Sequence, residues 1–370
     1  MYPNTDKKMN KKPKIFTIGG ATFDIFVKAK DQAIMSFATP ETKDMWLCLK
    51  HGGKIRVQEV IETFGGGATN TAVAFARMGF DACSIIKIGS HYGERVIENL
   101  KNEGVCTDFV KTTDKDRTGF STIINTFDGD RTVLAYSGAN QFFGPKDLPL
   151  KDMEKADWIY LNHLSEDDIE MSERILSVMK KNPKIKLAWN PGKEQLVQGV
   201  KKWRHLLAKT EVLLVNKEEA TLFTKVPYRL AGMKKEDPKY HVHVSRNFLP
   251  PYADDVCDIM IEFFKYGVKN VIITDGRSGA QASDGEHIYF CPIVSTKRVD
   301  TLGAGDSFGS GVTSAMILGK DLKTALIYGT LNANSVVNQY GAQAGLLTKA
   351  EMEKKFKSQD IHVASAKLVE

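Results

Sequence analysis

The chain has 370 residues, of which 42% are hydrophobic and 26% are charged, and its formal net charge is +6. This composition is ordinary for a globular protein that buries a sizeable core in one large α/β domain or two smaller ones. The positive excess lies partly in the first fourteen residues, and we find no interior basic patch interleaved with aromatic residues, so no nucleic-acid partner is expected.

The five cysteines form no C-x-x-C pair, which argues against a disulfide framework or a metal cluster and favours reduced thiols in a cytoplasmic protein. Residues 1–13 are expected to form a disordered tail, because they are polar and lack the apolar segment of a secretory signal. No run approaches the roughly 20 apolar residues of a membrane span, so no membrane partner is expected.

From residue 14 to residue 370, short apolar runs alternate with helix-forming segments, which predicts a mainly parallel sheet flanked by helices. Polar or glycine residues follow each predicted strand, and the strands are 15–18, 84–88, 158–161, 185–189, 212–215 and 271–274. Because ligands of open α/β sheets bind at the carboxyl ends of the strands, we expect the functional residues there.

Residues 24–62 and 110–136 depart from this alternation. The first segment mixes apolar and polar residues, and the second predicts a hairpin of strands 119–125 and 131–136 around a turn at 128–130. An edge ribbon on the main sheet is the alternative interpretation of the hairpin.

A glycine-rich segment, Gly65-Gly66-Gly67-Ala68-Thr69-Asn70, precedes an alanine-rich run that predicts a helix ending at Gly79. Bare glycine backbone lets a polar ligand approach closely, and the Asn70 amide can both donate to and accept from a polyol hydroxyl. The alternative is a tight turn in which Asn70 merely caps the helix.

Asn216-Lys217-Glu218-Glu219 follows a predicted strand. The oxygens of Asn216 and Glu219 would suit the hydration shell of Mg²⁺, and the alternative is a capped helix with acidic first-turn residues. In the segment 224–258, His241 and His243 lack a nearby third ligand, so no metal is assigned there.

The most specific segment is Asp300-Thr301-Leu302-Gly303-Ala304-Gly305-Asp306. The run 293–299 predicts a strand before it, and a helix is expected to begin near Ser307. A glycine turn that opens a helix presents backbone N–H groups at the positive end of the helix dipole, which favours an anion. Since Asp306 lies in the same turn, the segment suits phosphoryl transfer, with Asp306 as base and the backbone amides of Gly303, Ala304 and Gly305 around the moving group.

The two glycine segments together resemble the Gly-Gly-x-x-x-Asn and Asp-Thr-x-Gly-Ala-Gly-Asp signatures of the ribokinase-like (PfkB) family of carbohydrate and nucleoside kinases. The resemblance extends from about residue 14 to about residue 347. It implies a three-layer αβα fold with a small β lid, drawn from about 24–62 and 110–136, that excludes water from the sugar site. It further implies ATP as phosphoryl donor, Mg²⁺, a monovalent cation in some members, and dimerisation through the lid.

The resemblance also assigns roles to individual residues. It places four residues against the substrate: Asp24, Gly66, Gly67 and Asn70. It places others near the nucleotide, and these are Thr274, Gly276, Gly279, Asn334 and Asn338. Asn216 and Glu219 match the Asn-x-x-Glu motif of the family, which holds Mg²⁺ through water.

The substrate expected from these features is a neutral sugar or a sugar acid that is phosphorylated on a hydroxymethyl group, with a nucleoside as the second choice. Gly67 and His163 stand where ribokinase itself carries a lysine and a sugar-contacting glutamate. Arg131 could reach substrate from the lid or pair with Asp128 or Asp130.

Aromatic residues of the first lid segment could stack on a base or belong to the core, and they are Phe26, Phe37 and Trp46. A non-catalytic sugar- or nucleotide-binding regulator is the rival function. The presence of Asp306 argues against it, because a binder has no use for a base. A dehydrogenase is disfavoured because residues 19–24 lack the G-x-G-x-x-G pattern.

Overall fold

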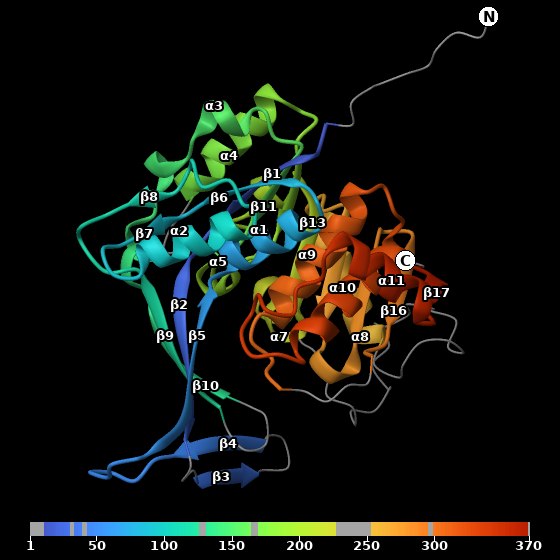
Figure 1. The fold of residues 1–370 in the computed structure, drawn as a ribbon. Helices are drawn as coiled ribbons and strands as arrows, with labels where there is room; N and C mark the ends of the chain where they lie inside the picture. The colour runs from blue at the N-terminus through green and yellow to red at the C-terminus, as the bar shows by residue number, and fades with distance from the viewer. Residues whose placement is uncertain are drawn as a thin grey trace, which may run out of the picture.

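The structure, a computed structural model, describes residues 11–29, 33–38, 43–125, 131–163, 169–226, 253–294 and 299–368. Within these residues the chain forms a large sheet covered by helices and a smaller sheet that extends away from this body (Figure 1). Several predictions lie outside the described residues, namely those for residues 1–10, Asp128, Asp130, His241 and His243. None of the helices in the described part of the chain combines the length and apolar character needed to cross a membrane.

The large sheet has nine strands in the described residues, in the order β17-β16-β15-β14-β13-β12-β11-β1-β6. The six strands from β14 to β6 are parallel, and the other three are antiparallel. Their bounds are β1 (Lys14–Ile18), β6 (Asp81–Ile85), β11 (Trp158–Leu161), β12 (Lys186–Trp189), β13 (Thr210–Asn216), β14 (Asn270–Thr274), β15 (Ala280–Ser283), β16 (His287–Cys291) and β17 (Ala364–Lys367). The predicted α/β class and mainly parallel sheet are therefore confirmed.

Two strand predictions need correction. The predicted strand 84–88 is split, because β6 ends at Ile85 and the short β7 (Lys87–Ile88) pairs with β8 (Lys111–Thr112) instead. The predicted strand 293–299 is wrong in its described residues, since Ile293, Val294 and Val299 lie in no strand. Pro292 follows β16 directly and has no N–H group to donate to a neighbouring strand, which ends the ladder there.

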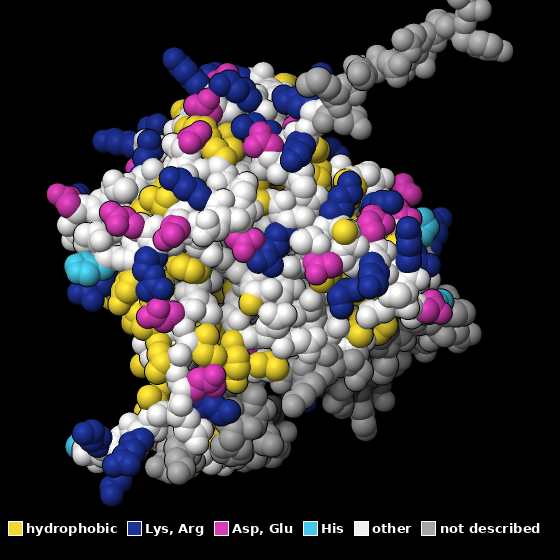
Figure 2. Space-filling model, viewed as in Figure 1, with side chains coloured by type: hydrophobic (Ala, Val, Ile, Leu, Met, Phe, Trp, Pro, Cys, Tyr) yellow, Lys and Arg dark blue, Asp and Glu magenta, His cyan; other side chains and the backbone are white. Residues whose placement is uncertain are grey.

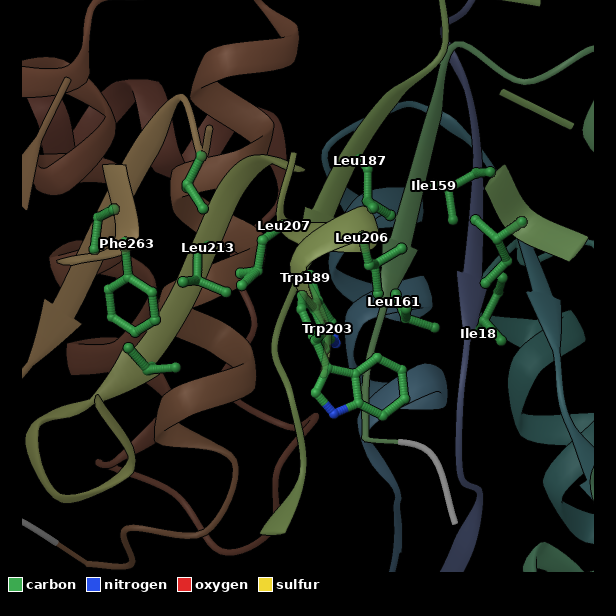
Figure 3. Packing of buried hydrophobic residues seen from close by; sticks show 14 of the residues in the cluster. Ile18, Ile159, Leu161, Leu187, Trp189, Trp203, Leu206, Leu207, Leu213 and Phe263 are labelled. Carbon is green, nitrogen blue, oxygen red and sulfur yellow. The ribbon is translucent and has the colours of Figure 1, made fainter. Parts of the chain in front are cut away.

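Helices cover both faces of the large sheet, because alternate residues of its buried strands point to opposite sides. Ile18, Leu161 and Trp189 pack on one face against helices of the middle of the chain (Figure 3). These helices are α3 (Leu150–Met153), α4 (Ile169–Lys181), α5 (Lys193–Gln198), α6 (Arg204–Leu207), α7 (Lys217–Thr224) and α8 (Ala253–Lys265). Ile15 and Tyr160 pack on the other face, against α1 (Gly67–Arg77), α9 (Ala304–Ile317), α10 (Leu322–Val336) and α11 (Lys349–Ser358).

Shorter elements complete the body. Helix α2 (Gly93–Asn102) packs its Val96 and Leu100 against α1. Short 3-10 helices occur at η1 (Gly138–Phe142), η2 (Pro145–Asp147) and η3 (Gly276–Ser278). The chain visits β1, then β6 on one side of it and later β11 on the other, so the strand order reverses at β1. A crevice for a ligand is expected at the carboxyl ends of strands at such a point.

The small sheet has the order β10-β9-β2-β5 and consists of β2 (Thr22–Ala29), β5 (Val57–Gly65), β9 (Gly119–Asn125) and β10 (Arg131–Tyr136). The predicted hairpin is confirmed, because β9 and β10 pair antiparallel from Asn125 opposite Arg131 to Phe120 opposite Tyr136. It joins this separate sheet, so the edge ribbon on the main sheet is excluded. A further pair, β3 (Ala33–Ala38) and β4 (Lys43–Cys48), lies beyond the far end of the small sheet in Figure 1.

The aromatic residues of this region separate into two environments. Phe26 is buried beside Tyr340, with ring centroids 6.0 Å apart, so it is a core residue. The Trp46 side chain is 60% exposed on β4. The side chain of Phe37 lies outside the described part of the structure.

Candidate active site

The start of helix α9 carries the central carboxylate. The helix begins at Ala304, three residues before the predicted Ser307, because Gly303 caps it in a left-handed conformation with φ 73°. A side chain at Gly303 would collide with Ala342, which accounts for the glycine. Asp306 therefore lies in the first helical turn, where backbone N–H groups have no acceptor within the helix.

Asp306 is joined to the other glycine segment across 236 residues of sequence: the Nδ2 atom of Asn70 donates to Asp306 Oδ2 over 2.8 Å. Burial raises the pKa of Asp306, and the hydrogen bond from Asn70 opposes part of that rise. A carboxylate with a raised pKa is a stronger proton acceptor than an exposed aspartate. The structure thus brings the two predicted glycine segments together at the Asp306 carboxylate.

The three consecutive glycines let the start of α1 pack tightly against its surroundings. A side chain at Gly65 would collide with Asp24, one at Gly66 would lie 2.5 Å from the carbonyl oxygen of Gly20, and one at Gly67 would lie 2.9 Å from Asn162 Oδ1. Gly66 is the helix cap and makes no side-chain cap bond. Asn70 lies inside the helix, so the alternative that Asn70 caps it is wrong.

Asp24 lies on β2 against this glycine turn and is 3% exposed. It accepts hydrogen bonds from Ser121 and Thr22, while its Oδ1 atom is buried without a hydrogen-bond partner among the described residues. Burial raises the pKa of Asp24, the two hydroxyls lower it, and the charge of Asp300 raises it further. A buried carboxylate oxygen without a partner is expected to bind a ligand hydroxyl.

An apolar cavity of about 320 Å³ lies beside the first turn of α9. Four predicted nucleotide residues line it: Thr274, Gly276, Gly279 and Asn334. Ile293, Val294, Ala333 and Val337 supply apolar walls, which suit a flat apolar group such as a nucleobase. The fifth predicted residue, Asn338, lies one helical turn beyond Asn334, donates to its carbonyl oxygen over 2.7 Å, and does not line this cavity.

A polar cavity of about 650 Å³ adjoins the apolar one, and Thr274, Gly276 and Gly305 line both. Asn216 and Glu219 line the polar cavity from the start of α7, and the loop after β14 contributes Asp275, Arg277 and Ser278. A cavity with backbone amides, an arginine and carboxylates suits a polyphosphate with a bound cation.

Asn216 and Glu219 also form a capping box. The Oδ1 atom of Asn216 accepts from the Glu219 amide over 2.8 Å, and Glu219 Oε2 accepts from the Asn216 amide over 2.8 Å. Burial raises the pKa of Glu219, the Asn216 amide lowers it, and the charges of Glu218 and Asp306 raise it. The capped helix proposed as an alternative is therefore present, at the wall of the polar cavity.

These oxygens fit Mg²⁺ held largely by water and phosphate. The structure groups no three His, Cys, Asp or Glu side chains around a metal position in its described part. Mg²⁺ commonly keeps several waters and binds through one or two carboxylates together with the phosphates of a nucleotide. The donor set at Asn216, Glu218 and Glu219 is compatible with that mode.

Arg131 reaches the site from the small sheet. Its guanidinium contacts the Thr301 hydroxyl, its Nε atom lies 4.0 Å from Asp300 Oδ1, and the side chain lines the polar cavity. A strand of the small sheet thus contributes a positive charge at the glycine turn that precedes α9.

No individual role at the site was predicted from the sequence for three of its polar residues. Asn162 follows β11 and is 1% exposed, and its Oδ1 atom has no hydrogen-bond partner among the described residues. Asn190 follows β12, donates to the carbonyl oxygen of Leu214 over 2.8 Å and lines the polar cavity. Asp300 is 2% exposed and accepts from the amides of Leu302 and Gly341. Asn162 and Asn190 each follow a predicted strand, which was the available signal.

The described contacts of His163 are with Gly192 and Glu194, and none is with Asp306. Its ring lies against Gly192, and its Nε2 atom is 3.5 Å from Glu194 Oε2. The His163 side chain is still 55% exposed; its partial desolvation lowers its pKa, and the charge of Glu194 opposes this.

Comparisons with known proteins agree with this architecture. The profile of the pfkB family of carbohydrate kinases matches residues 30–349. A ribokinase of Bacillus subtilis is 25% identical over 295 residues, which cover 78% of this chain and 86% of the relative. A solved ribokinase of Arabidopsis thaliana with ribose and ATP has a TM-score of 0.71 at 20% identity, covering 94% of this chain and 99% of that chain. A Burkholderia thailandensis nucleoside kinase with inosine has a TM-score of 0.68 at 17% identity, covering 93% and 98%. With both glycine segments at one carboxylate and a family profile that spans most of its length, the chain belongs to the pfkB family of carbohydrate kinases.

Proposed function

We propose that this kinase transfers the γ-phosphoryl group of ATP to the hydroxymethyl group of a sugar or sugar acid. The observation that carries the proposal is the placement of Asp306 in the first turn of α9. It accepts a hydrogen bond from Asn70 of α1, and its neighbour Gly305 lines both cavities. A base, a polyol-binding turn and space for a nucleotide thus meet at one helix start.

In this mechanism Asp24, Gly66, Gly67 and Asn70 orient the substrate, with the unpartnered Oδ1 of Asp24 as an acceptor for its hydroxyls. The substrate oxygen attacks the γ-phosphorus, its proton passes to Asp306, and the bond between the γ-phosphorus and the bridging oxygen breaks to release ADP. Backbone amides of Gly303, Ala304 and Gly305 receive the negative charge of the moving group.

The nucleotide occupies both cavities in this proposal. Its base lies in the apolar cavity near Thr274, Gly276, Gly279 and Asn334, with Asn338 supporting Asn334. Its phosphates lie in the polar cavity, which Asn216 and Glu219 line. These two residues would hold Mg²⁺ through water, and the ion would neutralise phosphate charge. A monovalent cation remains an expectation of the family resemblance.

We infer that residues 14–370 form one kinase domain, with lid strands from 24–62 and 110–136. The support is that the lid strands β2 and β9 meet the body beside Gly65 and Asn140. There the side-chain amide of Asn140 accepts from the Ala21 N–H over 3.0 Å and donates to the Ala21 carbonyl oxygen over 2.9 Å. Arg131 of the lid strand β10 also lines the polar cavity.

Incubation with Mg-ATP and a panel of sugars, sugar acids, sugar phosphates and nucleosides tests the function, with ADP release as the measurement. Turnover of one sugar or sugar acid, lost when EDTA replaces Mg²⁺, supports the proposal. Turnover of a nucleoside alone selects the second candidate. Binding of ATP or sugar without any turnover favours the regulator. Replacing K⁺ by tetramethylammonium measures the dependence on a monovalent cation.

We propose that the outer face of the small sheet forms a homodimer. Its register places Val60 beside Val27 and Ile124, and Leu134 beside Thr122 and Ile25. Val60 and Leu134 are 56% and 58% exposed, and Figure 2 shows apolar side chains gathered over these strands. Exposed apolar sheet faces of this kind usually bind a partner.

A charge on this face should separate the dimer, because an unpaired carboxylate would be buried in the interface. We expect light scattering to show a dimer for the native chain and a monomer for Val60→Glu and Leu134→Glu. Val197→Glu is the matched control, since Val197 is 53% exposed on α5, far from the lid strands in sequence and on the body of the protein. A monomeric native chain, or dimeric variants, would contradict the prediction.

A further inference from the structure

A chain of side-chain amides leads from the far side of α1 to Asp306. Asn99 on α2 donates through Nδ2 to Gln343 Oε1 over 2.9 Å. Gln343 Nε2 in turn donates to Asn70 Oδ1 over 3.0 Å. Asn70 Nδ2 then donates to Asp306 Oδ2 over 2.8 Å. Gln343 and Asn70 are 8% and 4% exposed, so water competes little for these bonds.

The direction of this chain matters because a side-chain amide has a donor end and an acceptor end. If the Asn70 amide were turned by half a rotation, its carbonyl oxygen would face the Asp306 carboxylate and its amino group would face the Gln343 amino group. Both contacts would then be repulsive. As long as Gln343 presents Nε2 to Asn70, only the orientation that donates to Asp306 makes two hydrogen bonds.

We propose that Gln343 is a positioning residue for phosphoryl transfer, which fixes the orientation of Asn70 and thereby keeps a hydrogen-bond donor on Asp306. The inference rests on the proposed role of Asp306 as the base. The donor from Asn70 stabilises the carboxylate, so it keeps Asp306 ionised at pH values where burial alone would favour the protonated acid.

A purely structural role for the Gln343 side chain is disfavoured, because other groups already hold its loop. Arg77 Nη1 donates to the carbonyl oxygens of Gln343 and Leu346 over 3.0 and 2.8 Å. The Leu347 amide donates to Asn332 Oδ1 over 3.0 Å. The loop backbone is therefore anchored on both sides without the Gln343 side chain.

The charged groups around Asp306 are few in the described elements packed on α9. Tyr160 on β11 and Glu219 on α7 interact electrostatically with Asp306. On α1 the titratable side chain is Arg77, which pairs with Glu103. On α10, Tyr328 donates to Glu353, and Lys323 lies near the exposed start of the helix. On β13, Glu211 pairs with Lys186. Asn70 is therefore the neutral donor that acts on the Asp306 carboxylate.

Gln343→Met and Gln343→Glu test the proposal. An ionised carboxylate at this position cannot donate to Asn70 Oδ1 and would attract Asn70 Nδ2 away from Asp306, whereas methionine removes both hydrogen bonds at similar volume. We expect kcat at pH 7 to fall by about 10-fold to 100-fold, the range of one hydrogen bond to a charged group. In the pH profile of kcat, the fall on the acid side should move to higher pH, while KM for ATP stays unchanged. The control is Gln198→Met, because Gln198 accepts a hydrogen bond from Trp203 away from the site.

A measurement without turnover separates this inference from the proposed function. Asp306→Asn is combined with Gln343→Met, and the melting temperature of each of the four proteins is followed from pH 5 to pH 8. Asp306→Asn should stabilise the Gln343→Met protein more than the native chain at pH 8, because an Asp306 without its donor carries a larger penalty when ionised. The difference should shrink as the pH falls. Equal stabilisation in both backgrounds, or an unmoved acid limb of kcat, would overturn the inference. Absence of turnover on every substrate would reject the kinase proposal and leave the stability comparison to decide on Gln343.

Discussion

Asp306→Asn should lower kcat by about 10² to 10⁴, the range expected for loss of a general base. Asparagine keeps the shape of the side chain and still accepts the hydrogen bond from Asn70, but it cannot take the proton of the attacking hydroxyl. ADP release with the substrate identified from the panel measures the effect, and KM for both substrates should change little. A variant with native kcat would remove Asp306 from the chemistry.

The same substitution should leave the protein equally stable or more stable at neutral pH. Burial raises the pKa of Asp306 in the folded protein, so its ionisation opposes folding fully above the folded pKa. This penalty shrinks as the pH falls below the folded pKa and is absent below the unfolded pKa. Asparagine carries no charge and removes the penalty. A melting temperature at or above that of the native chain shows that lost activity is not lost folding. For the native enzyme, kcat should fall as acid protonates Asp306.

Gly305→Val should lower ATP-dependent turnover by a factor on the order of 10² without unfolding the protein, the scale expected when a reacting group is displaced by about 1 Å. Gly305 lies in the first turn of α9 and lines both cavities. A Cβ atom there would meet no protein atom within 4 Å, so the added side chain would occupy the space that the proposed function gives to the nucleotide. Glycine is a poor helix former, so replacing Gly305 within α9 does not cost helix propensity.

Calorimetric titration with a non-hydrolysable ATP analogue separates blocked binding from other defects, since the Kd of Gly305→Val should rise and that of Gly305→Ala should rise less. Gly144→Val is the matched control: a Cβ at Gly144 also meets no atom within 4 Å, and Gly144 lies at the start of η2, outside both cavities. Native nucleotide affinity in Gly305→Val would show that the nucleotide does not approach this turn.

The predicted strands 15–18, 158–161, 185–189, 212–215 and 271–274 were found in the main sheet, because strands buried on both faces require nearly continuous apolar runs. The run 293–299 has a similar pattern but another cause. Ile293 and Val294 line the apolar cavity beside α9, where Ile293 remains 40% exposed, and Pro292 prevents the strand from continuing. An apolar run in the sequence therefore does not show whether its residues pack in a sheet or line a cavity.

The split of the predicted strand 84–88 has a related origin. The amide of Lys111 donates to the carbonyl oxygen of Ile86 over 2.9 Å, so the chain after β6 pairs with a segment that is distant in sequence. Backbone hydrogen bonds of this kind carry no side-chain signature in either segment. Their partners become visible only once the surrounding elements have packed.

By itself the sequence determined most strands in the centre of the main sheet, the hairpin, the two glycine segments and the presence of Asp306 and Asn70, because turns, helix starts and buried strands depend on nearby residues. The tertiary structure alone decided that Asn70 donates to Asp306 and that Gln343 holds Asn70, since these contacts arise from the packing of α1, α9 and the loop after α10. Gln343 belongs to no predicted motif, and its proposed role depends on a hydrogen bond to Asn70, which lies 273 residues away in the chain.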